Sequence, residues 1–167
     1  MFGTSWRAAS WYVSADLAKK IRLGIDELAI VREQMGPLIA LPSNAPVGVM
    51  ETNAACAMLH SFYTEIEKLL TIIAREWDGK ELSSASWHKD LLNQMATATE
   101  KRPAILSTAL VEVLSEFLAF RHLFRGASIA LMRWAKLSPL LAKASMTYDQ
   151  TAKALEEFVR FMETRAE

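Results

Sequence analysis

The sequence is poor in cysteine, glycine and proline, and neither sign of charge is in excess. It contains 1 cysteine, 6 glycines and 5 prolines in 167 residues. The single thiol, Cys56, cannot form an intramolecular disulfide, and the lack of a cysteine framework is typical of a reducing compartment. With 19 basic and 19 acidic residues, the chain has no global positive charge, so any contact with nucleic acid must be local.

Signals for export and for membrane insertion are also missing. Residues 1–7 contain no basic start followed by an apolar run, so we expect no signal peptide. No stretch of about 18 uninterrupted apolar residues occurs, so we expect no membrane span. Together with the single cysteine, these absences predict a cytoplasmic protein.

Linear motifs of common catalytic and metal sites are absent too. The chain has no glycine-rich phosphate loop, no cysteine pair at metal-binding spacing and no histidine pair one helical turn apart. The sequence therefore predicts no metal site and no bound cofactor. Its three histidines, His60, His88 and His122, can meet only through the fold, and the pattern favours packing or local hydrogen bonds for His60 and His88.

What is present is a repeated pattern of apolar residues at steps of three and four, with 51% hydrophobic residues overall. Ser14 and Ser107 are suitable N-caps, and Gly79 is suited to the position just after a helix. Continuation of the fourth helix through 129–134 stays open. The pattern predicts helices over about 14–35, 49–77, from 87 to before 102, 107–126 and 147–164. We expect an all-α, four-to-five-helix up-down bundle in a single domain over residues 1–167.

The basic residues Arg121, His122 and Arg125 form the strongest candidate for a functional site. Arg121 and Arg125 are one helical turn apart and would project together toward a shared anion such as phosphate. The alternative is that the two arginines pair with carboxylates of the bundle, such as Glu112 or Glu116.

Several segments, taken in order, resemble the HepT-like ribonuclease toxins of the HEPN superfamily, the toxin half of HEPN/MNT toxin–antitoxin systems. The resemblance covers about residues 57–141 and is carried by 59–67, 73–79, 87–92, 102–107, 120–125 and 136–141. It implies a helical HEPN bundle that forms a homodimer and cleaves RNA without metal at a cleft between the two subunits. It also implies an MNT-type nucleotidyltransferase antitoxin as the partner.

The motif of that family departs from its usual form in this chain. An arginine should be followed after four residues by a histidine and, two residues later, by a tyrosine. The arginine falls on Arg121, but Gly126 stands at the histidine position and Ser128 at the tyrosine position. Arg121 can stabilise charge but cannot transfer protons, and His122 is the one neighbour that could replace the histidine.

Loss of acid-base catalysis costs about 10²- to 10⁴-fold in rate, so the resemblance implies a ribonuclease with impaired or lost activity. The antitoxins of the family modify the tyrosine with AMP. Ser128 is shorter and less acidic than a phenol, so an antitoxin is expected to act here by binding alone.

Two other functions remain open from the sequence. The first is a noncatalytic interaction module that binds a nucleotidyltransferase or another bundle through helix faces near Phe120, Phe124 and Met132. The second is a bundle that binds a small molecule or nucleotide between its helices, which needs no linear motif.

Overall fold

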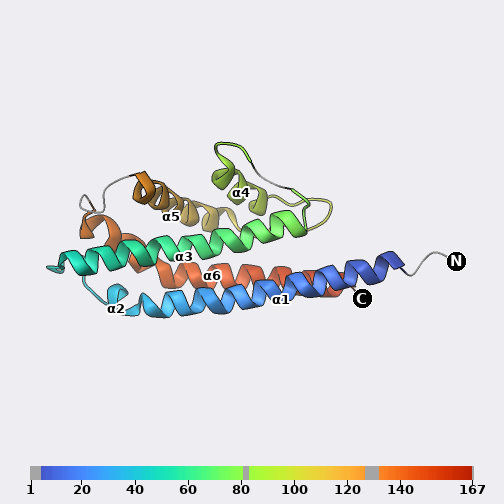
Figure 1. Ribbon diagram of the computed structural model, residues 1–167, viewed down its shortest axis with the longest axis horizontal. Helices are drawn as coiled ribbons and strands as arrows, with labels where there is room; N and C mark the ends of the chain where they lie inside the picture. Colours follow the sequence, from blue (N-terminus) through green and yellow to red (C-terminus); the bar gives the residue numbers. More distant parts are fainter. Residues whose placement is uncertain (1–4, 81–82, 127–131, 167) are drawn as a thin grey trace.

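The computed structural model describes residues 5–80, 83–126 and 132–166, and all the regular elements in these ranges are helices (Figure 1). The helices are α1 (Ser5–Gln34), α2 (Gly36–Ile39), α3 (Val49–Glu76), α4 (Trp87–Ala96), α5 (Thr108–Gly126) and α6 (Trp134–Ala166). Because α2 is a single turn of 4 residues, the bundle is built from the other five. The predicted all-α class is confirmed.

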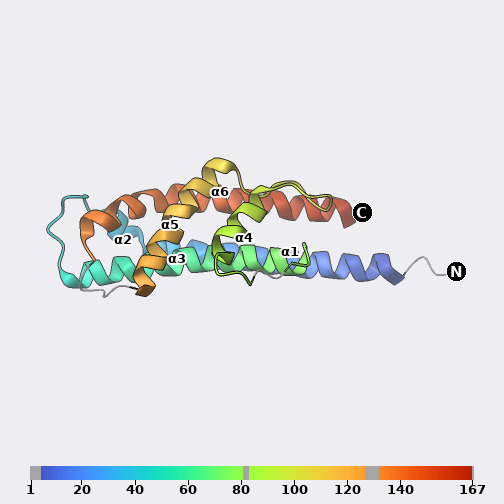
Figure 2. The same cartoon turned by 90° about the horizontal axis from the view of Figure 1, so that it is seen from above.

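Three long helices, α1, α3 and α6, lie side by side along the length of the molecule (Figures 1 and 2). α1 and α5 run toward one end and α3 and α6 toward the other, which gives the expected up-down order. The short helix α4 and α5 pack together on α3, outside the layer of long helices. The described chain therefore begins and ends at the same end of the molecule.

α3 is the central helix, because α1, α6, α4 and α5 all contact it. Its buried positions recur every three or four residues over most of its length. They are Ala55, Cys56, Leu59, Phe62, Tyr63, Ile66, Glu67, Leu69, Leu70, Ile73 and Ala74. Glu67 is the one charged residue in this set and must be paired, because an unpaired buried charge is costly. In the described part of the chain, no helix is long and apolar enough to cross a membrane.

The start of α1 differs from the prediction. Ser14 is not an N-cap, because the chain is already helical from Ser5, and Ser14 is buried within the helix. Residues 5–13 contain neither glycine nor proline and include alanines, the strongest helix formers, so nothing ends the helix before Ser14.

α6 also begins earlier than predicted, at Trp134 instead of near 147, and it contains Pro139. The proline removes one backbone donor, but it lies in the second turn, so only one helical hydrogen bond is lost. Around it Leu137, Leu141 and Ala144 are buried, and this packing outweighs the loss. Residues 127–131 lie outside the described ranges, but Met132 and Arg133 are not helical, so α5 does not continue unbroken to Trp134.

Two predicted caps are confirmed. Gly79 has φ 68°, the left-handed conformation that a glycine adopts without strain, and the N–H of Lys80 donates to the carbonyl of Ala74. At the start of α5 the N–H of Leu110 donates to Oγ of Ser107 at 3.2 Å.

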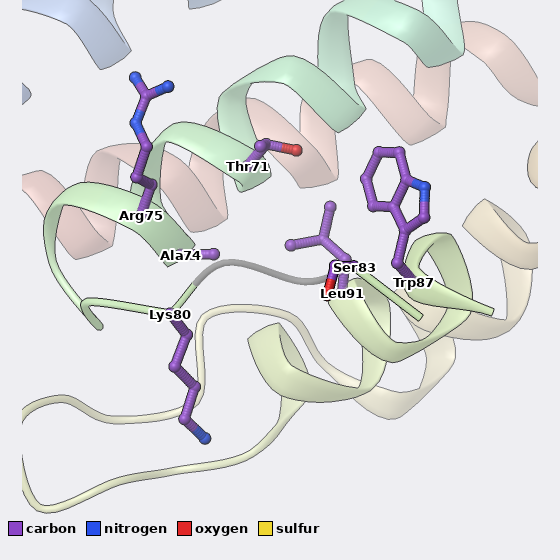
Figure 3. Close-up of a pocket in the computed structure, with 7 residues that line it drawn as sticks. All are labelled: Thr71, Ala74, Arg75, Lys80, Ser83, Trp87 and Leu91. Carbon is purple, nitrogen blue, oxygen red and sulfur yellow. The ribbon is translucent and has the colours of Figure 1, made fainter. Parts of the chain in front are cut away.

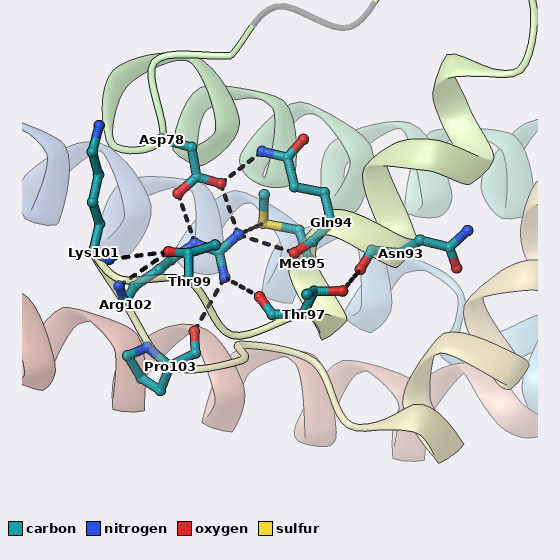
Figure 4. A network of polar contacts seen from close by, with 9 residues as sticks. All are labelled: Asp78, Asn93, Gln94, Met95, Thr97, Thr99, Lys101, Arg102 and Pro103. Atoms are coloured by element: carbon teal, nitrogen blue, oxygen red, sulfur yellow. Dashed lines mark hydrogen bonds and ion pairs between the residues drawn. The ribbon is translucent and has the colours of Figure 1, made fainter.

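A buried arginine fixes the far end of α4 against the end of α3 (Figure 4). The side chain of Arg102 is 0% exposed, and its Nε and Nη2 donate to the two carboxylate oxygens of Asp78 at 2.8 and 2.7 Å. The same guanidinium donates to the carbonyls of Gln94 and Thr97 in the last turn of α4 and just after it. Two parallel charge-assisted hydrogen bonds of this kind are strong and directional, so α4 is held in one position.

Candidate functional site

Arg121, the centre of the predicted site, lies in the last two turns of α5 and turns toward α3 and α4. Its side chain is 11% exposed, and its Nη2 lies 3.3 Å from Oε1 of Glu67 in α3. Its Nη1 lies 3.4 Å from Nε2 of His88, at the start of α4. The fold thus gathers an arginine, a carboxylate and an imidazole from three helices.

On α3, His60, Tyr63 and Glu67 follow one another at steps of three and four residues, so they share one face of the helix. This face points toward Arg121, because Oε1 of Glu67 lies 3.3 Å from Nη2 of Arg121. The ring of His60 also lies 5.1 Å from that of Phe124, one turn beyond Arg121 on α5. α3 therefore forms the floor of the site.

The contacts of His88 define which of its ring nitrogens carries the proton. Nδ1 lies 2.6 Å from Oε2 of Glu67, and a carboxylate can only accept, so Nδ1 is the donor. Nε2 faces a guanidinium, which can only donate, so Nε2 is the acceptor. Both contacts describe a neutral imidazole with a free electron pair on Nε2.

The surroundings of His88 also favour the neutral form. Burial lowers the pKa of His88, and the nearby charges of Arg121 and His122 lower it further, against the opposing effect of Glu67. Its ring lies against that of Trp87, tilted by 30° at a centroid distance of 3.6 Å, and its centroid is 5.3 Å from that of His122. The imidazole is therefore held on both sides, and both its contacts and its lowered pKa favour the neutral form.

Several buried polar atoms around Arg121 have no hydrogen-bond partner among the described residues: Nδ1 of His60, the hydroxyl of Tyr63 and Nε of Arg121. Burial lowers the pKa of His60, with further contributions from Arg121 and Arg125, while burial raises the pKa of Tyr63. Unpaired buried donors and acceptors are costly, so this region is suited to a polar ligand or water.

The predicted site residues differ in how far they are exposed to solvent. His122 and Arg125 are exposed, whereas Arg121 is largely buried, so the two arginines do not form a symmetric pair. Arg121 does pair with a carboxylate, but with Glu67 and not with the suggested Glu112 or Glu116.

Gly126 is the last residue of α5 and is exposed. A Cβ atom built on it would meet nothing within 4 Å, so a larger side chain fits there without rearrangement. Ser128, at the tyrosine position of the motif, lies outside the described residues.

A cavity of about 240 Å³ lies beside the site, between the second half of α3, the chain after Gly79 and α4 (Figure 3). Two of the residues that line it are neighbours of the site. Trp87 directly precedes His88, and Thr71 lies one helical turn after Glu67 on α3. Arg75 and Lys80 contribute positive charge at its walls. Within the described ranges, no group of three or more histidine, cysteine, aspartate or glutamate side chains is arranged to hold a metal ion.

The prediction from the sequence missed Glu67 altogether and did not connect His88 or His60 with Arg121. A signal for Glu67 exists, because it occupies a position of the buried stripe of α3 between Tyr63 and Leu70. A charge at such a position must have a partner. No local pattern identifies that partner, since His88 and Arg121 are brought in from other helices.

The profile of the HepT-like protein family matches residues 54–162. The chain belongs to the HepT-like protein family. The match runs from α3 into α6 and includes Glu67, His88 and Arg121, so the site of this HepT-like protein lies inside the shared region.

The predicted family resemblance is thereby confirmed, and the matched region extends beyond residue 141 to residue 162. No curated protein and no solved structure matches this HepT-like protein. Its site must therefore be interpreted from its own residues.

Proposed function

We propose that this HepT-like protein is the toxin-side member of a toxin–antitoxin pair, an RNA-binding homodimer whose metal-independent endoribonuclease activity is strongly reduced. The observation that carries the proposal is the position of Arg121, the counterpart of the family's motif arginine, beside His88 and next to the exposed His122 and Arg125. A phosphate at this edge of α5 would meet several hydrogen-bond donors and positive charge on an otherwise neutral chain.

The reduction of activity follows from the end of α5. Gly126 cannot transfer a proton, and Ser128 replaces the tyrosine of the motif. Since positioned acid-base groups contribute about 10²- to 10⁴-fold, the chain should cleave RNA slowly while keeping its affinity for phosphate.

An MNT-type nucleotidyltransferase is the proposed partner, and family membership supports it. With a serine in place of the tyrosine, the partner is expected to act on this protein by binding. The noncatalytic interaction module is the competing function, and the experiment below separates the two.

The test is RNA cleavage and binding without metal, with transfer RNA and total RNA as substrates. The unmodified protein is compared with a Gly126→His/Ser128→Tyr variant, for which the open space at Gly126 leaves room. We expect the variant to cleave about 10²-fold faster or more, because it regains an acid-base group.

Binding is tested separately with Arg125→Gln, since Arg125 is exposed and its replacement does not disturb the core. We expect weaker RNA binding. The slope of the logarithm of affinity against the logarithm of salt concentration should fall by the amount due to about one phosphate contact. Arg160→Gln, an exposed arginine of α6, is the matched control and should leave binding unchanged. If neither the unmodified protein nor the double variant binds or cleaves RNA, the interaction module is the better description.

A further inference from the structure

The buried imidazole of His88 has the properties of a general base, although the family motif does not include its position. We propose that His88, oriented by Glu67, supplies the residual proton transfer of this site in the absence of a histidine at Gly126. The inference rests on the RNA-directed function proposed above and adds a catalytic role to a residue outside the motif.

The geometry provides the base and the cation side by side. Glu67 binds Nδ1 of His88 at 2.6 Å and leaves Nε2 unprotonated, and Nε2 lies 3.4 Å from the guanidinium of Arg121. A scissile phosphate bound to Arg121 would bring its neighbouring ribose 2′-hydroxyl to Nε2. This combination of an oriented base and an adjacent positive charge is what cleavage of a phosphodiester requires.

A purely structural role explains these contacts less well. Buried ion pairs generally stabilise a fold less than apolar residues of the same size would, so the pair of Glu67 and Arg121 beside a neutral His88 needs another reason. In addition, Nε of Arg121 and the hydroxyl of Tyr63 are buried and have no hydrogen-bond partner in the described part of the chain. A set of contacts optimised only for stability would satisfy these atoms.

The site is close enough to the surface for a substrate to reach it. The side chains of His88 and Arg121 are 9% and 11% exposed, and His122, whose ring lies 5.3 Å from that of His88, is exposed. The RNA backbone would approach along the edge of α5 that carries His122 and Arg125. Catalytic hydrogen bonds are often long before substrate binds, and the 3.4 Å contact agrees with this.

The proposed step balances without any co-reactant other than water. Nε2 of His88 takes the proton of the ribose 2′-hydroxyl, and the 2′-oxygen forms a bond to phosphorus. The bond from phosphorus to the 5′-oxygen breaks, and that oxygen takes a proton from water. The products are a 2′,3′-cyclic phosphate and a 5′-hydroxyl, and His88 returns its proton to solvent.

The first test uses His88→Asn, whose amide can still donate to Glu67 but has no base at the position of Nε2. In the unmodified background we expect cleavage to fall at least about 100-fold, with RNA binding kept. In the Gly126→His/Ser128→Tyr background the same change should lower cleavage far less, because the introduced histidine supplies proton transfer. Structural damage would instead lower cleavage equally in both backgrounds.

The second test is the pH dependence of kcat/KM. The ionisable groups that face His88 are Glu67 from α3 and Arg121 and His122 from α5. Activity should rise with pH as His88 loses its proton. Glu67→Gln removes the one group that raises the pKa of His88, so this rise should move to lower pH.

The outcomes separate this inference from the proposed function. Cleavage that survives His88→Asn would overturn the role of His88, as would a pH profile that Glu67→Gln does not shift. RNA binding by the unmodified protein without any cleavage would also overturn it, yet would leave the RNA-binding function in place.

Discussion

Each end of α4 is held by a carboxylate that belongs to α3 or directly follows it. Glu67 binds His88 in the first turn of α4, and Asp78 binds Arg102, which follows the C-terminal end of α4. The pair of Asp78 and Arg102 is bidentate, and the guanidinium of Arg102 also donates to backbone carbonyls. The position of His88 relative to Arg121 therefore depends on contacts at both ends of a helix of 10 residues.

The Asp78–Arg102 pair gives a prediction for stability against pH. Burial by itself would raise the pKa of Asp78, but the hydrogen bonds and charge of Arg102 and the amide of Gln94 hold it below its usual value. A depressed pKa means that the carboxylate stabilises the fold above its unfolded pKa, about 3.9, and that this contribution is lost as the pH falls. Asp78→Asn should cost about 3 to 5 kcal/mol near neutral pH.

The measurement is the free energy of unfolding by denaturant over a pH series. The difference between the unmodified protein and Asp78→Asn should be constant at higher pH and shrink below about pH 4. Asp149→Asn, on the exposed side of α6, should change stability by less than about 0.5 kcal/mol. A difference that grew on acidification would contradict the pairing.

At the scale of the elements, the closest approach of α1 to α3 depends on a glycine. A Cβ atom on Gly24 would overlap Cδ2 of Leu69 and lie 3.0 Å from its Cγ, and Leu69 is buried. The two helices can pack this closely because Gly24 has no side chain, although glycine costs about 1 kcal/mol in helix propensity relative to alanine.

Gly24→Ala should therefore destabilise the protein, by about 1 to 3 kcal/mol, in spite of alanine's better helix propensity. Thermal or chemical unfolding measures the effect. Gly36→Ala, where an added Cβ meets nothing within 4 Å, is the matched control. Gly24→Ala combined with Leu69→Ala should recover part of the loss, and a stabilised Gly24→Ala protein would show that the helices can separate at no cost.

The elements differ in how well the sequence predicts them. α3 and α5 were predicted almost to the residue, because unbroken apolar stripes end at clear signals such as Gly79 and begin at a cap such as Ser107. The early part of α6 was missed, because Pro139 suggests a break and only tertiary burial of its neighbours overrides it. Local propensity cannot reveal that burial.

At the scale of the whole molecule, the site depends on the arrangement of helices and on little else. Arg121 was predicted because it lies in a cluster of basic residues within one helix and falls where the resemblance implies the arginine of the motif. Glu67 and His88 join it only because α3, α4 and α5 pack together, and no spacing in the sequence records this. Family membership predicts the bundle, while Gly126 and Ser128 stand where the resemblance implies the histidine and tyrosine of the motif.

The proposed homodimer can be tested on the face of α5 that carries the site. Leu123 follows His122 on α5 and is 55% exposed, so a second subunit that packs on this part of α5 would bury it. Leu123→Glu should weaken dimerisation about tenfold or more, since burying a leucine contributes about 1.5 to 3 kcal/mol. Sedimentation equilibrium measures the change.

Leu23→Glu is the matched control, because Leu23 is 53% exposed on α1 and lies away from α5. It should leave the dimer intact. Equal effects of the two substitutions would place the interface elsewhere, and a monomer at all concentrations would contradict the dimer.

The reactivity of the buried cysteine of α3 reports how often the bundle opens. Cys56 is fully buried, and burial raises the pKa of its thiol, so an alkylating reagent can react only when the bundle opens. The rate of trapping then measures the population of open molecules. Because a ligand that binds the closed bundle lowers that population, slower alkylation would reveal RNA or a partner protein without a label and without any need for catalysis.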